Sequence, residues 1–417
     1  MFRPSRTPAD TPRRNLNLLW FAQSTSLVGL QTGSVAIPLL AVDVLGASAS
    51  QVAVIGTLSS LPWLIAPIIG PIVDRANRHR LLVIAHLGRS LLWLTLPLAY
   101  LLGVLTLPQL WIVCAAVGLL GVVFAVGYRT FLPTIVAREN LGAANGRMGG
   151  TDAVARAAGP AFAGSLVQVA GAAWTILVQT TTAVLAAVAT ARIRPAPRSL
   201  QADRAQQRFR PADWWRSIVD GFRHVYRIRA LRWIALGDTA YLFCFDLCFA
   251  VVVVFFRSTL GLSPGMIGLI FSIGSLGGIL GAMLANRIRA RHGFDRTVRT
   301  AAVLRGFGLL MLPASLLAPN PATGIAMLIM ARGINASAWS VYEVLTDTYQ
   351  QTVLPDAHRG SAIAAILWLG NVASTVAAAT AAALAAATNT STVVAAAGIG
   401  AAVASLISLR ISTTPQR

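Results

Sequence analysis

The stretch Gly70-Pro71-Ile72-Val73-Asp74-Arg75-Ala76-Asn77-Arg78-His79-Arg80 lies between two apolar runs, residues 52–69 and 81–102. Each run is long enough to cross a bilayer as a helix, which needs about 20 apolar residues. The short segment between them carries three Arg and one Asp. Because basic loops stay on the cytoplasmic side of a membrane, this stretch predicts a tight cytoplasmic turn between two membrane-spanning helices.

The composition of the whole chain is that of an integral membrane protein. Of its 417 residues, 56% are hydrophobic and only 12% are charged, about half the charged share of soluble proteins. All of the 34 basic residues are Arg, and the formal net charge is +20. In a soluble chain this charge would suggest nucleic-acid binding. Here the Arg residues gather at the chain ends and in the longer connections, so they predict a cytoplasmic surface and no nucleic-acid partner.

The apolar runs predict an all-α integral membrane protein with twelve transmembrane helices in two six-helix bundles. The N-terminal bundle is expected over residues 16–191 and the C-terminal bundle over 231–409, with cytoplasmic tails at 1–15 and 410–417. The first tail lacks the apolar core of a signal peptide, so we expect a multi-pass protein of the plasma (inner) membrane with both termini cytoplasmic. The expected spans are 16–44, 52–73, 81–102, 109–131, 146–169, 173–191, 231–256, 266–285, 298–317, 322–344, 361–387 and 393–409.

The linker between the bundles, residues 192–230, is expected to contain an amphipathic helix. Its second part keeps apolar residues at helical spacing from Trp214 to Tyr226, with Arg216 and Arg223 between them. Such a helix lies either in the headgroup region of the membrane or beneath the bundle, and the sequence leaves both open.

The two halves of the chain repeat each other. Leu45-Gly46-x-Ser48 before the second span corresponds to Leu260-Gly261-x-Ser263 before the eighth, and Arg89 corresponds to Arg305. The offset stays between 215 and 218 residues over three places, which predicts two pseudo-symmetric bundles. We expect the third and ninth spans at the bundle periphery, so that Arg89 and Arg305, near their inner ends, have a structural role at the inner surface rather than contact with substrate.

Three motifs resemble those of one transporter family. The pattern Gly70-x-x-x-Asp74-Arg75-x-x-Arg78-x-Arg80 resembles the loop 2–3 signature of the major facilitator superfamily. The run Leu354-Pro355-Asp356-x-x-Arg359-Gly360 is similar to the drug, macrolide and siderophore exporter branch. In the fifth span, an exporter signature is matched with two Ala substitutions by Gly146, Ala155, Gly159, Pro160 and Gly164.

The resemblance implies a proton antiporter that exports multiple drugs or natural products by alternating access. Such a protein works as a monomer without cofactor, with the lipid bilayer, protons and a small-molecule substrate as its partners. The loop motif would act as a cytoplasmic latch, in which Asp74, Arg75 and Arg78 pair with inner helix ends when that side closes.

Ionisable residues inside the spans are the candidates for proton coupling, because charges are costly to bury in a membrane. Asp246 lies deep in the seventh span without a basic neighbour one turn away, and Asp238 lies two turns earlier. Asp246 could instead serve only as a hydrogen-bonding group, and Asp238 could be the next proton-binding position. Helical spacing also predicts an ion pair in the fifth span and a shared face in the tenth. These residues are Asp152 with Arg156, and Arg332 with Glu343.

The substrate is expected to be hydrophobic or amphipathic, because few fixed charges lie in the spans that face the cavity in this family. Tyr241, Trp339 and Trp368 are the candidates for lining that cavity. The chain contains no H-E-x-x-H and no phosphate-binding G-x-x-x-x-G-K motif, and neither an enzyme nor a metal site is predicted. The alternatives are an importer or a lipid-moving carrier of the same superfamily, or a membrane scaffold or sensor.

Overall fold

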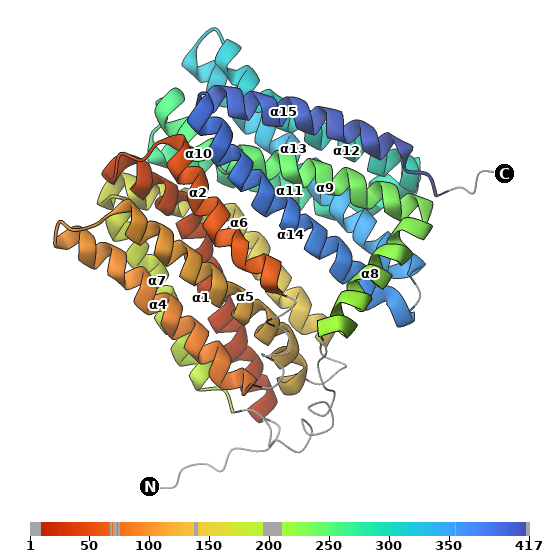
Figure 1. Cartoon of the computed structure of the whole chain (residues 1–417), viewed down its shortest axis with the longest axis horizontal. Coiled ribbons are helices and arrows are strands. Elements are labelled where there is room, and N and C mark those ends of the chain that lie inside the picture. The colour runs from red at the N-terminus through yellow and green to blue at the C-terminus, as the bar shows by residue number, and fades with distance from the viewer. Residues whose placement is uncertain are drawn as a thin grey trace.

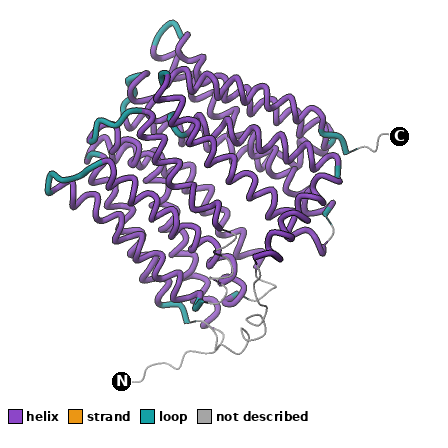
Figure 2. Tube along the Cα trace, viewed as in Figure 1, coloured by secondary structure: helices purple, strands orange, loops and turns teal. Residues whose placement is uncertain are grey.

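The computed structural model describes residues 10–66, 69, 73, 76–136, 141–194, 211–354 and 356–413. These residues are almost entirely helical, and none of them forms a strand (Figure 2). Gly70, Asp74 and Arg75 of the predicted latch lie outside the described residues. Arg78 and Arg80 lie at the start of a helix that Asn77 caps, since its side-chain Oδ1 accepts a hydrogen bond from the Arg80 amide at 3.1 Å.

The first bundle is built around α1 and α7. Helix α1 packs against α6 and α7, α4 packs against α5 and α7, and α2 packs against α5. The bounds are α1 Asp10–Leu39 with a π-helical turn Leu40–Val44, α2 Ala49–Ser60 with a 3-10 turn Leu61–Ile65, α4 Arg78–Leu101, α5 Leu107–Ile135, α6 Leu141–Ala170 and α7 Ala172–Ala191.

The second bundle follows the linker helix α8, Pro211–Arg227. Helix α13 packs against α11 and α12, while α15 packs against α9 and α12, and α14 against α9. The axis of α9 bends by 42° into the segment Val252–Thr259 that continues it. The bounds are α9 Arg229–Phe249, α10 Val252–Val254 with a π-helical turn Phe255–Thr259, α11 Pro264–His292, α12 Phe294–Ala314, α13 Pro321–Val353, α14 Asp356–Ala387 and α15 Thr390–Ile407.

The helices account for the predicted membrane crossings. Among the described residues, eight helices are long and apolar enough to span a bilayer, or nine if the bent pair of α9 and Val252–Thr259 is one span. Helix α2 with its 3-10 turn is shorter, and α6 and α13 have the length but carry ionisable side chains. In the described residues, each of the twelve expected spans overlaps one of these helices or the bent pair, and the predicted fold class is confirmed.

The internal repeat is visible in local structure. The π-helical turns Leu40–Val44 and Phe255–Thr259 end at equivalent positions. Each is followed by a glycine with positive φ, 62° at Gly46 and 66° at Gly261, a conformation that residues with a side chain rarely adopt. Ser48 and Ser263 then cap α2 and α11 through their hydroxyl groups. The end of the molecule with these two turns is called the hairpin end below.

The opposite end, called the terminal end, carries the start of α1, the end of α15 and the linker helix (Figure 1). Helix α8 packs against α14 there. A Cβ atom at Gly221 would lie 2.3 Å from the Ser361 carbonyl oxygen, so the two backbones touch. The Phe222 ring lies edge-to-face on Trp368. The linker helix therefore packs against the second bundle, and its position relative to the membrane headgroups stays a prediction.

Candidate functional site

The two bundles touch along α6 and α11 and along α2 and α14. The α6–α11 contact is close because glycines meet there. A Cβ atom at Gly164 would lie 2.3 Å from the Pro264 carbonyl oxygen, and one at Gly268 would lie 2.2 Å from that of Pro160. Any larger residue would force the helices apart, so the contact depends on small residues.

Polar contacts support the same interface near the hairpin end. The Gln168 side-chain oxygen accepts a hydrogen bond from the Gly265 amide at 3.0 Å, and the Ser272 hydroxyl accepts one from Ala161 at 2.8 Å. Asp43 at the end of α1 forms an ion pair with Arg257 at 2.8 Å. The sequence interpretation did not find this pair. The feature that could have indicated it is that Asp43 and Arg257 are isolated charges of opposite sign at the ends of the first and seventh spans.

The fifth-span motif divides its contacts between the two bundles. Gly164 and Pro160 face α11 of the second bundle, as described above. Gly159 faces α1, where a Cβ atom would lie 2.4 Å from that of Gln31. Ala155 is buried, whereas a Cβ at Gly146 would meet nothing within 4 Å.

A cavity of about 590 Å³, the interbundle cavity, lies between α6 of the first bundle and α9, α11 and α13 of the second. It brings together side chains that are far apart in sequence. Arg156 pairs with Asp152 at 2.7 Å, and the Trp339 indole N–H donates to Glu343 at 3.1 Å. The candidates that line this cavity are Asp152, Arg156, Arg332, Trp339 and Glu343.

Arg332 is held by aromatic rings. It is 8% exposed, and its guanidinium lies 4.9 Å from the Phe249 ring centroid and 5.5 Å from that of Phe271. It donates a hydrogen bond to Asn335 at 3.4 Å. No carboxylate of the described residues lies within ion-pair distance of it.

Asp246 lies apart from the interbundle cavity. Its carboxylate accepts a hydrogen bond from the Ser374 hydroxyl of α14, the helix that also packs against α2 of the first bundle. The Asp246 side chain is therefore placed between two helices of the second bundle, close to a contact between the halves.

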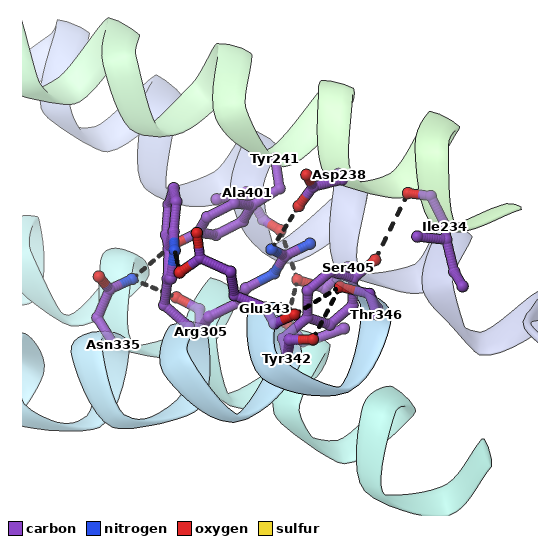
Figure 3. A network of polar contacts seen from close by, with 12 residues as sticks. Ile234, Asp238, Tyr241, Arg305, Asn335, Tyr342, Glu343, Thr346, Ala401 and Ser405 are labelled. Carbon is purple, nitrogen blue, oxygen red and sulfur yellow. Dashed lines mark hydrogen bonds and ion pairs between the residues drawn. The ribbon is translucent and has the colours of Figure 1, made fainter. Parts of the chain in front are cut away.

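Asp238 is engaged in an ion pair inside the second bundle (Figure 3). Its carboxylate lies 2.7 Å from the guanidinium of Arg305, whose residue is only 1% exposed. The rings of Tyr241 and Tyr342 cover that guanidinium at 4.0 and 3.7 Å. Arg305 therefore has structural contacts, as expected, but it lies in the interior and not at the inner surface, because a carboxylate and two aromatic faces stabilise it there.

The three aromatic candidates differ in whether they line the interbundle cavity. Tyr241 is fully buried and accepts a hydrogen bond from Asn335 at 2.6 Å. Trp368 packs on Phe222 of the linker helix. Neither residue lines the interbundle cavity, whereas Trp339 does.

A second cavity of about 800 Å³, the first-bundle cavity, lies among α1, α2, α4, α5 and α7. Phe249 and Ala250, at the end of α9, contribute to its wall from the second bundle. The lining is mostly apolar and includes Trp63, Trp93 and Phe124. Arg89 also lines it, so this side chain faces a cavity within the first bundle.

Metal chemistry has no support in the described part of the chain. There, no three His, Cys, Asp or Glu side chains are grouped to hold a metal ion. Cys114, Cys244 and Cys248 are free and buried, consistent with small apolar packing residues.

Comparisons with known proteins agree with this architecture. A family model described as a transmembrane secretion effector matches residues 9–416, while a search of curated proteins gives no match. The nucleoside transporter NupG superimposes with a TM-score of 0.72 at 12% identity, over 96% of this chain and 100% of that one.

Two further solved structures share the fold. A bacterial homologue of the iron transporter ferroportin, in an inward-facing state, has a TM-score of 0.71 at 15% identity, covering 98% of this chain and 100% of its own. A bacterial homologue of the human lysosomal transporter Spinster has a TM-score of 0.69 at 12% identity, covering 99% and 100%. Because the family model covers nearly the whole sequence, the chain belongs to the transmembrane secretion effector family of major facilitator transporters.

Proposed function

We propose that this transporter exports a hydrophobic or amphipathic small molecule from the cell by proton-coupled alternating access. The observation that carries the proposal is the arrangement of the two bundles. They meet in close backbone contact at Gly164 and Gly268, and a cavity lined by both bundles contains ionisable side chains. Two bundles related by a repeat can rock about such a contact and expose a cavity to either side in turn.

The orientation in the membrane follows from the charges. The terminal end carries the basic linker helix and the start of α4, whereas Arg257 is the lone Arg among the described residues near the hairpin end. The positive-inside rule therefore assigns the terminal end to the cytoplasm and the hairpin end to the outside of the plasma membrane. In this orientation the Asp43–Arg257 pair joins the two bundles on the outer side, which supports a conformation closed on that side.

Export is favoured over import by the fifth-span motif. In the resemblance noted above, this pattern belongs to exporters, and its Gly164 and Pro160 lie against α11. The proton would bind to carboxylates inside the bundles, and the best placed are Asp246 beside Ser374 and Glu343 in the interbundle cavity. Asp238 is less suited because it is held by Arg305.

The test is transport in inverted membrane vesicles, with a panel of cationic, neutral and anionic fluorescent amphipathic dyes. Wild-type protein should accumulate at least one dye when the vesicle lumen is acidic and stop when a protonophore removes the gradient. Asp246→Asn or Glu343→Gln should abolish the gradient-driven part. Asp220→Asn is the matched control, because Asp220 forms only an exposed ion pair with Arg223 on the linker helix.

The outcomes separate the alternatives. Accumulation that is indifferent to the gradient would contradict proton coupling while leaving transport intact. Uptake into right-side-out vesicles, with none into inverted vesicles, would reverse the direction and favour an importer. Loss of coupling in only one of the two variants would assign the proton to that carboxylate.

A further inference from the structure

Among the described residues, Arg89 has no hydrogen-bond or ion-pair partner, and it lines a cavity with no other charged side chain. Among the described residues that line the first-bundle cavity it alone is charged. Its guanidinium makes no hydrogen bond or ion pair with the described residues, and its Nε atom is buried. Gln23 Oε1 and Gln179 Nε2, from two other helices that line the same cavity, are also buried without partners.

The second half of the chain shows what such an Arg requires. Arg305, which is 216 residues after Arg89, is paired with Asp238 and covered by Tyr241. The π-helical turns at the ends of the first and seventh spans are offset by 215 residues. The same offset places Gln23 at the position of Asp238.

At that offset Ser26 occupies the position of Tyr241, and both Gln23 and Ser26 line the first-bundle cavity. The first half therefore keeps the cation but has an amide in place of the carboxylate and a hydroxymethyl group in place of the phenol ring. Asp238 and Tyr241 fill the space beside Arg305 in the second bundle, whereas the first bundle has a cavity beside Arg89.

The energetics favour an anion from outside the chain. An unpaired guanidinium away from bulk water costs several kcal/mol, and a carboxylate in good geometry offsets that cost. The planar fork of Arg matches a carboxylate with two parallel hydrogen bonds. The rest of the wall suits an apolar body, because the rings of Trp63, Trp93, Phe124 and Phe249 line it.

We propose that the first-bundle cavity binds an apolar small molecule carrying one carboxylate, which Arg89 holds as Arg305 holds Asp238. The inference rests on the proposed transport of apolar small molecules and narrows their class to organic acids. The cavity of about 800 Å³ is within the size range of sites for drug-sized ligands. Gln23 and Gln179 then supply amide groups around the bound carboxylate.

The test is direct binding to the purified protein in detergent. The probes are pyrenebutyrate and its uncharged counterpart pyrenebutanol, detected by energy transfer from Trp63 and Trp93 to pyrene. Wild-type protein should bind the acid at least about tenfold more tightly than the alcohol, the size of one charge-assisted contact. Equal affinity of the wild type for acid and alcohol would overturn the proposal.

Two variants should remove the preference for the acid. Arg89→Gln deletes the cation, and Gln23→Asp supplies an internal carboxylate where the second half has Asp238. Each should weaken pyrenebutyrate binding at least about tenfold and change pyrenebutanol binding by less than about twofold. Unchanged acid affinity in both variants, with both eluting as monodisperse protein in size-exclusion chromatography, would contradict the role of Arg89.

Matched controls separate charge from shape. Gln23→Asn has the size of Asp without its charge and should weaken acid binding less than Gln23→Asp does. Arg223→Gln removes an exposed Arg of the linker helix and should leave both affinities unchanged. Arg89→Lys keeps the charge and should retain part of the preference for the acid even if Arg89→Gln folds poorly.

Competition identifies the source of the carboxylate. Displacement of pyrenebutyrate by palmitate would point to a fatty acid, and displacement by benzoate but not palmitate to a soluble aromatic acid; either supports the proposal. Displacement by chloride or sulfate alone would reduce the site to one for inorganic anions and overturn it. Binding is measured without a proton gradient or a membrane, so failed dye export and failed acid binding are distinguishable.

Discussion

Asp43 and Arg257 are 214 residues apart in the chain, and their side chains meet at 2.8 Å where the first bundle touches the second. Both side chains are partly exposed, 28% for Asp43 and 35% for Arg257. Such a pair contributes up to about 1 kcal/mol, enough to shift a two-state equilibrium about fivefold without locking it. The pair therefore biases the closed state of the hairpin end and still allows it to open.

We predict that Asp43→Asn opens the hairpin end. Spin labels at Val104→Cys and Leu317→Cys, exposed positions at this end of either bundle, would report the distance in a background without native cysteines. The population with the longer distance should rise by up to about fivefold. The charge swap Asp43→Arg with Arg257→Asp should restore the wild-type distribution, and failure to do so would show that the ion pair is not the cause.

Gly164→Ala should impair transport severely. Its Cβ would lie 2.3 Å from the backbone carbonyl of Pro264, and backbone cannot move aside as a flexible side chain can. We expect dye transport to fall at least about tenfold, since the close packing of α6 on α11 is lost. Gly146→Ala lies in the same helix with nothing within 4 Å, so it should transport normally and gain slightly in stability from the better helix propensity of Ala.

Asp238→Asn should destabilise the second bundle. It leaves the buried guanidinium of Arg305 without a countercharge, and because the Asp238 side chain is partly exposed we expect a cost of about 1–3 kcal/mol, below that of a fully buried pair. The thermal unfolding midpoint in detergent should fall clearly. Asp220→Asn removes a carboxylate from an exposed pair and should change stability by no more than about 1 kcal/mol. Equal midpoints for the two variants would refute the structural role assigned to Asp238.

Gly221→Ala should release the linker helix from α14. The added Cβ would collide with the Ser361 carbonyl oxygen at 2.3 Å. Hydrogen exchange in α8 should therefore become faster, while exchange in α4 stays as in the wild type. Gly360→Ala, on α14 one residue before Ser361, meets nothing within 4 Å and should leave α8 protected.

The fold could be predicted from the sequence because the membrane makes the signal strong. A crossing helix needs about 20 apolar residues, and the runs around the Gly70–Arg80 stretch are long enough to be recognised individually. The repeat was visible from Gly46 and Gly261, since a positive φ restricts the residue type. Each of these constraints acts within a short stretch of the chain, so it can be recognised from the sequence alone.

The site was predictable only in part, because helical spacing gives the separation of residues along one helix and not the neighbour that a helix face meets. Asp152 with Arg156 and Arg332 with Glu343 were singled out as separate pairs, and the structure lines one cavity with all four. Asp238 was taken as a proton site because nothing in its own helix reveals Arg305, which reaches it from α12. Arg89 and Arg305 occupy equivalent positions of the repeat. Their surroundings differ because the first half has the neutral Gln23 where the second half has the carboxylate of Asp238.

The bend between α9 and Val252–Thr259 joins parts of the molecule that were discussed separately above. The Ala250 amide at the bend donates to the Asp246 carbonyl at 2.9 Å, and the Phe249 and Ala250 side chains close the first-bundle cavity. A change in the 42° angle between α9 and Val252–Thr259 would move these two side chains and the helical turn that carries Asp246 together. The cargo and the proton of the proposed function would then both act on this bend, with no need for contact between them.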